Sequence, residues 1–152
     1  MLSSDIRSQI DSIWNAFWSG GISNPMEVLE QITYLLFIRR LDDAHTLEES
    51  KALLLKQPMA QRIFPEGKDA AGRPYDDLRW SRFKNFAPAE MFNVVGERVF
   101  PFLRNRGGDG STYSQHMKDA RFTIPTPGLL AKVVDMLGHV PMEDRDTNGG
   151  LV

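Results

Sequence analysis

Cysteine is absent from the 152 residues, which excludes disulfide bonds, thiolate zinc sites and cysteine nucleophiles. No run of about 18 apolar residues occurs, so no transmembrane helix is predicted. The first residues lack the basic and apolar regions of a signal peptide, and we expect a cytoplasmic protein. A surplus of positive charge is also missing: the net charge is −2, whereas free-standing nucleic-acid-binding proteins are usually basic.

Motifs that carry chemistry are equally scarce. The chain has no glycine-rich phosphate loop that follows a strand and opens a helix. Its three histidines, His45, His116 and His139, are far apart and lack metal-site spacing, so we interpret them as surface or helix-cap histidines. We therefore predict no catalytic, cofactor-binding or metal-ligating residue in this chain.

Helical signals, by contrast, are plentiful. Apolar residues recur at helical spacing after Ser3 or Ser4, and Gly20-Gly21 ends this first helix. A second start combines Asn24 as N-cap with Pro25 in the first turn. The stretch 33–38 that follows is apolar nearly all round, which is typical of a helix at the centre of a bundle. We expect this helix to end at Asp42-Asp43.

The remaining elements follow from weaker patterns. Pro58 should stop a short helix, and residues 65–75 show no periodicity. Pro88 opens a further helix, which Pro101 should kink or shorten. The predicted elements after Asp43 are helices over 46–56, 88–102, 112–120 and 126–138, and loops over 65–75 and 105–110.

No β-strand alternation of useful length is present, so we predict an all-α fold. The expected architecture is a compact irregular bundle of about 5–7 helices around the central apolar helix, with long loops. Residues 1–140 would form the helical domain, and residues 141–152 a polar tail or linker towards a missing catalytic domain. The aromatic stripe Trp14, Phe17, Trp18 and Phe37 is interpreted as core.

Charge is unevenly distributed along the chain. Residues 1–50 carry a net charge of −5, whereas residues 79–121 carry eight basic and four acidic side chains, a net charge of +4. Arginine offers a fork of donors to phosphates, so a basic face could contact DNA; an ordinary mixed-charge surface is the alternative. The candidate DNA or partner contacts are Arg79, Arg82, Arg104, Arg106, Lys118 and Arg121.

Trp80, flanked by Arg79 and Arg82, has two interpretations. It could stack on a flipped base. Alternatively, it could pack on the bundle while the arginine stems lie beside it.

The order of these segments resembles one family. The chain reads DIRSQIDSIW over 5–14, EQITYLLFIRRLD over 30–42 and LRWS over 78–81, and then has the helical segment 122–137. This order resembles the N-terminal helical domain of type I restriction-modification DNA methyltransferase subunits (HsdM, the N-6 DNA methylase family). The resemblance covers nearly all of the chain, and its most specific piece is the helix with the arginine pair at 39–40.

The resemblance implies a further α/β domain that binds S-adenosylmethionine and methylates N6 of adenine through an Asn-Pro-Pro motif. The chain has no Asn-Pro-Pro run, so we expect it to be a piece of that subunit or a gene product that ends at the domain boundary. The full-length subunit that the chain resembles is a site-specific DNA adenine-N6 methyltransferase. This chain alone is not expected to catalyse methyl transfer.

The family also implies partners: a specificity subunit, a second methyltransferase subunit, a restriction subunit and double-stranded DNA. By resemblance, the domain would help to assemble this complex and to close it around DNA. The alternative is a stand-alone helical scaffold that binds only proteins.

Overall fold

The computed structural model describes residues 4–59, 62–105 and 117–141, and the helices in these ranges confirm the all-α prediction. The described residues form no β-strand and only one isolated bridge, between Lys68 and Pro74. The helical elements are α1 (Ser4–Ser19), α2 (Pro25–Leu55), the 3-10 helix η1 (Tyr75–Leu78), α3 (Trp80–Phe83), α4 (Pro88–Val94), the π-helical turn η2 (Val95–Val99), α5 (Phe100–Asn105) and α7 (Pro127–Gly138).

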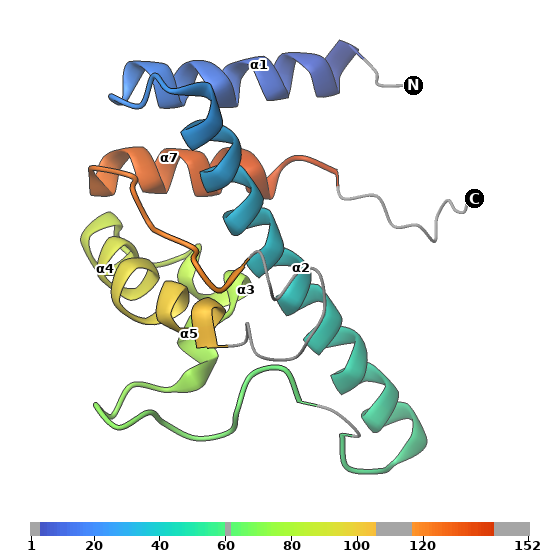
Figure 1. Cartoon of the computed structure of the whole chain (residues 1–152). Coiled ribbons are helices and arrows are strands. Elements are labelled where there is room, and N and C mark those ends of the chain that lie inside the picture. The colour runs from blue at the N-terminus through green and yellow to red at the C-terminus, as the bar shows by residue number, and fades with distance from the viewer. Residues whose placement is uncertain (1–3, 60–61, 106–116, 142–152) are drawn as a thin grey trace.

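Helix α7 lies between two neighbours, with α1 along one side and α4 on the other (Figure 1). Helix α2 crosses this layer, contacts α3 and runs on towards the opposite end of the molecule. The apolar face of α7 is buried by these neighbours and consists of Leu129, Leu130, Val133, Val134 and Leu137. No helix in the described ranges is both long enough and apolar enough to cross a membrane.

The start of α2 follows the sequence prediction. Asn24 has extended backbone angles, and its side-chain oxygen accepts hydrogen bonds from the backbone N–H groups of Met26 (2.9 Å) and Glu27 (3.4 Å). These are two of the N–H groups that have no partner within the helix. Within the apolar stretch, Tyr34, Leu35 and Ile38 are buried, as expected for a central helix.

The predicted end of this helix at Asp42-Asp43 is wrong. Helix α2 continues without a break to Leu55, so the two helices expected over 24–41 and 46–56 are one. Asp42 is buried, with 4 % of its surface exposed, and its carboxylate accepts hydrogen bonds from Arg79 and from the backbone of Ser81. Asp42 therefore does not mark a helix end, because its carboxylate binds Arg79 and Ser81, which are distant in sequence.

The irregularity predicted at Pro101 takes the form of a π turn. The chain stays helical from Pro88 to Asn105, and the Phe100 N–H bonds to the carbonyl of Val95, five residues back. Proline has no N–H, and in a regular α-helix its ring clashes with the carbonyl four residues earlier. The wider spacing of the π turn accommodates such a residue, so the helix does not end there.

The aromatic stripe is core only in part. Phe17 is fully buried, and Trp14 and Phe37 are partly buried against the core, but Trp18 is 47 % exposed. Other predictions fall outside the described residues: most of the helix over 112–120, the loop after Asn105 and the polar tail after residue 141.

Candidate DNA interface and buried polar network

The six predicted cationic residues separate into two groups. Arg79 and Arg82 flank Trp80 at α3, while Arg104, Lys118 and Arg121 lie at α5 or on the segment that follows the undescribed residues. Arg106 lies outside the described residues. The two groups differ in what their side chains already bind.

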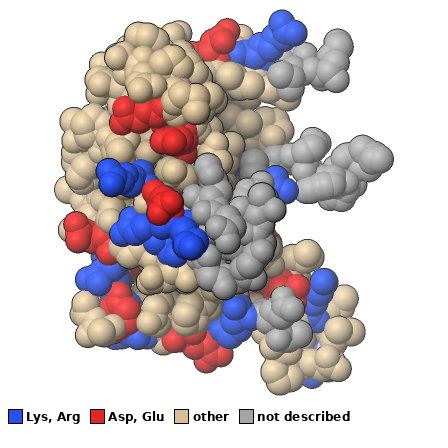
Figure 2. All heavy atoms as spheres, in the orientation of Figure 1, with Lys and Arg blue, Asp and Glu red and all other residues tan. Residues whose placement is uncertain are grey.

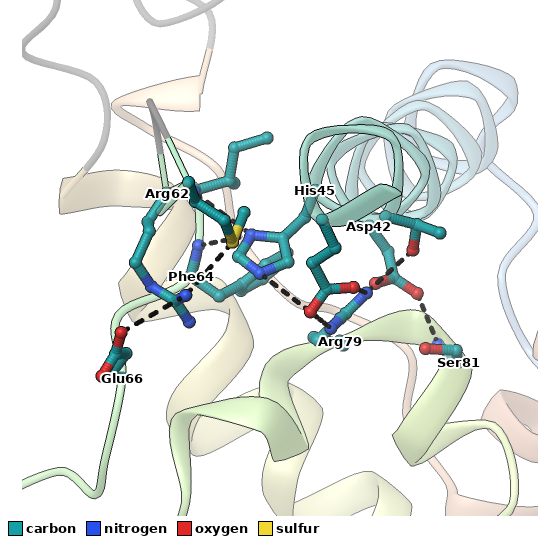
Figure 3. A network of polar contacts seen from close by, with 11 residues as sticks. Asp42, His45, Arg62, Phe64, Glu66, Arg79 and Ser81 are labelled. Atoms are coloured by element: carbon teal, nitrogen blue, oxygen red, sulfur yellow. Dashed lines mark hydrogen bonds and ion pairs between the residues drawn. The ribbon is translucent and has the colours of Figure 1, made fainter. Parts of the chain in front are cut away.

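Arg79 is held between α2 and α3 (Figure 3). Its side chain is 12 % exposed, and its Nε donates to the Asp42 carboxylate. Its Nη2 donates to the Thr46 hydroxyl at 2.8 Å, and its Nη1 donates to Glu49 Oε2 at 3.1 Å. The second Asp42 oxygen accepts the Ser81 N–H at 2.9 Å. We call these residues the Arg79 network; it joins the middle of α2 to the start of α3.

Charge in the Arg79 network is mutually stabilised. Burial lowers the pKa of Arg79, but hydrogen bonds and charge interactions with Asp42 and Glu49 outweigh it, so the pKa is raised overall. The guanidinium is therefore firmly charged, and its donors are occupied by α2. Arg79 is therefore already bound within the fold and is not a candidate for DNA contact.

Trp80 and Arg82, which lie on α3 beside Arg79, also make contacts within the fold. Trp80 is 4 % exposed and makes an edge contact with Phe83, with ring centroids 5.5 Å apart. The packing interpretation of Trp80 is therefore the one observed. Arg82 is half-exposed and donates to Asp77 Oδ1 at 3.0 Å.

His45 corrects another prediction, because it is a core residue rather than a surface or cap histidine. It is fully buried on α2, next to the Arg79 network. Its Nδ1 lies 3.3 Å from the backbone nitrogens of both Ile63 and Phe64. His139, in contrast, is exposed at the C-cap of α7, as interpreted, and His116 is outside the described residues.

The second cationic group lies on or beside residues 117–126, which begin with a turn and continue without regular secondary structure; we call these residues the strap. The strap is fixed at three backbone positions. The Arg104 guanidinium donates to the Ala120 carbonyl at 3.0 Å. The buried Gln31 amide donates to the Arg121 carbonyl at 2.8 Å and accepts the Thr123 N–H at 3.2 Å. The side chains of Lys118 and Arg121 therefore project from a backbone that α2 and α5 hold in place.

A groove of about 740 Å³ opens between the strap and the helix formed by α4, η2 and α5. The Phe122 ring lines this groove and packs close to Gly96. A Cβ at position 96 would lie 3.1 Å from the ring, so the glycine leaves room for it. Lysine and arginine atoms gather on this face, together with some acidic atoms, over the position of α5 in Figure 1 (Figure 2). The groove, called the strap groove below, is lined by Ala89, Phe92, Asn93, Gly96, Glu97, Arg104, Arg121, Phe122, Thr123, Ile124 and Pro127.

Comparison with family models matches residues 6–137 of the chain to the HsdM N-terminal domain. The chain belongs to this family. The HsdM N-terminal domain is the N-terminal domain of type I restriction-modification methyltransferase subunits. No curated protein and no solved structure matches the chain. The matched range runs from α1 to the end of α7, so the Arg79 network and the strap groove both lie within this HsdM domain.

Sequence reasoning missed three polar residues that organise the domain: Gln31, Asp42 and His45. All three lie on the buried face of α2. The signal was present, because these residues share a helical face with Val28, Leu35 and Ile38. A polar residue in an apolar stripe is expected to have a hydrogen-bond partner, but the sequence does not identify it.

Proposed function

We propose that this HsdM domain is an assembly and DNA-clamping module of a type I adenine-N6 DNA methyltransferase. Its partners would be a specificity subunit, a second methyltransferase subunit and a restriction subunit, in the cytoplasm. Family membership supports the type I context. The described residues form no sheet whose strand ends could hold S-adenosylmethionine, so we assign no residue here to cofactor binding or methyl transfer.

The proposed DNA contact is supported mainly by the exposure of the strap cations and by the few contacts that their side chains make. Lys118 and Arg121 are exposed, and neither side chain has an ion pair or hydrogen bond with another described residue. Arg104 is exposed as well and uses one nitrogen, Nη1, on Ala120. These three side chains can donate to phosphates without breaking an ion pair within the described fold.

Charge reversal of the strap tests this contact. In the assembled methyltransferase complex, Lys118→Glu combined with Arg121→Glu should weaken DNA binding at low salt. It should also reduce the slope of log Kd against log salt by roughly 2, because about one counterion is released per phosphate contact. Fluorescence anisotropy with labelled duplex at several salt concentrations measures both quantities.

The matched control is Arg7→Glu on α1, another exposed cation of the same domain that lies outside the strap groove. It should leave the salt slope unchanged. Unchanged affinity and slope in the double variant would place the DNA contact elsewhere.

A protein-binding scaffold is the second candidate function, and one observation favours it. The last turns of α2 expose four leucines, Leu47, Leu53, Leu54 and Leu55, and one of them, Leu53, lines a groove of about 880 Å³. Exposed apolar patches commonly mark protein contacts. The charge-reversal experiment separates the candidates, because a pure scaffold would assemble normally and keep its DNA affinity when the strap charges are reversed.

A further inference from the structure

We propose that His45 is a protonation-controlled clasp that holds the loop residues Ile63 and Phe64 against α2. This inference is independent of the DNA contact proposed above. It starts from the direction of two hydrogen bonds: the N–H groups of Ile63 and Phe64 both point to His45 Nδ1, at 3.3 Å. A ring nitrogen that accepts hydrogen bonds carries no proton, so His45 must be neutral, with its proton on Nε2.

The second ring nitrogen has little to stabilise a positive charge. His45 Nε2 is buried without a hydrogen bond, and its nearest acidic atom is Glu49 Oε2 at 3.6 Å. That same oxygen already accepts a hydrogen bond from Arg79. Protonation would place an N–H opposite two backbone N–H groups and would leave a buried charge poorly compensated.

The charged groups around His45 come from every element packed on it. Asp42 and Glu49 lie on α2, Arg79 precedes α3, and Arg62 lies on the loop, where it pairs with Glu66 at 3.5 Å. Burial is the main cause that lowers the pKa of His45, and Arg79 and Arg62 add to it. Glu49 and Asp42 oppose this shift without reversing it.

The loop that His45 holds contributes to the core. Phe64 is fully buried and stacks on Phe102 with ring centroids 5.3 Å apart. The Phe64 ring also makes an edge contact with the His45 ring. The Arg79 guanidinium carbon lies over the Phe64 ring, 6.0 Å from the ring centroid. Release of Ile63 and Phe64 would therefore break the two ring contacts by which Phe64 links His45 on α2 to Phe102 on α5.

The sign of the pH effect follows from the lowered pKa. Above the unfolded pKa, about 6.5, His45 is neutral in both states and the clasp contributes fully. As the pH falls below 6.5, the released state takes up a proton that the closed state resists. The equilibrium for release therefore rises by up to about tenfold per pH unit until the folded pKa is reached.

Nuclear magnetic resonance on the 152-residue chain tests the clasp directly. The His45 ring should titrate below 6.5, and the ring 15N shifts at neutral pH should identify the Nε2–H tautomer. The protection factors of the Ile63 and Phe64 amides, corrected for intrinsic exchange, should fall by up to about tenfold per pH unit in the same range. A normal or raised His45 pKa, or protection that does not follow its titration, would overturn the proposal.

A pair of variants separates the clasp from general acid sensitivity. His45→Asn keeps a carbonyl acceptor near the Nδ1 position but cannot titrate, so it should remove the pH step in Ile63 and Phe64 protection. His139→Asn changes an exposed histidine and should keep the step. The same step in His45→Asn would mean that another group controls the loop, and the wild-type titration still decides the case if this variant does not fold.

Discussion

The two halves of α2 differ sharply, although they form one unbroken helix of 31 residues. In the first half, Leu35 and Ile38 are completely buried by the rest of the bundle. In the second half, Leu53 and Leu54 are 81 % and 84 % exposed. The Arg79 network and His45 lie between the two halves, where α2 meets α3 and the loop at Phe64.

This difference shows that leucine content alone does not determine which part of a helix becomes core. Both halves are rich in good helix formers, so both are helical. Burial depends on whether another element covers the face, and the described residues pack mainly on the first half. The exposed end is held in place by polar contacts at Asp42 and His45.

Removal of the Asp42 carboxylate should have the largest effect. Asp42→Ala leaves the buried Arg79 guanidinium without its main partner, although Glu49 and Thr46 remain. Loss of one member of a buried ion pair typically destabilises a protein by about 3–5 kcal/mol. Urea unfolding followed by circular dichroism should show this decrease in the free energy of unfolding.

The neighbouring acid provides a control at the same point of the helix. Asp43 is exposed, and Asp43→Ala should cost less than about 1 kcal/mol, as is usual for surface charges. Equal losses in the two variants would mean that the join between the halves does not depend on the Arg79 network.

The two halves can then be compared with one substitution. Leu35→Ala removes a fully buried side chain and should destabilise the domain by about 3 kcal/mol, within the range of buried leucine truncations. Leu54→Ala removes an exposed side chain and should change stability by less than about 0.5 kcal/mol. Thermal or urea unfolding of the isolated chain measures both, and a large loss in Leu54→Ala would show that the exposed half is covered in solution.

Much of the fold could be predicted because its signals are local. The N-cap at Asn24, the apolar periodicity of α7 and the disturbance near Pro101 each depend on residues within a few positions of one another. The predicted break at Asp42-Asp43 failed for the opposite reason. Adjacent acids favour a helix end only if solvent covers them, and Arg79, 37 residues away, binds one of them instead.

The candidate site could be predicted less completely. The sequence identified the cationic residues but could not separate Arg79, which binds α2, from Arg121, which lines the strap groove. Both are arginines in the same basic stretch, and their difference arises from partners distant in sequence. Gln31 illustrates the same limit, because its bonds to the strap span about 90 residues.

The smallest predicted effect concerns the exposed end of α2, where Lys56 has a left-handed backbone with φ of 54°. The Lys56 N–H donates to the Leu53 carbonyl, and the Gln57 N–H donates to the Ala52 carbonyl. This pair of hydrogen bonds is a Schellman motif, which favours glycine at position 56. Lys56→Gly relieves about 1 kcal/mol of steric cost but adds freedom to the unfolded chain, so a net stabilisation of about 0.5 kcal/mol is expected. Urea unfolding measures this gain, and Lys51→Gly, inside the same half of the helix, should instead destabilise by up to about 1 kcal/mol. Destabilisation by both substitutions would indicate that α2 does not end at Leu55 in solution, and the exposed half would then extend further than the structure shows.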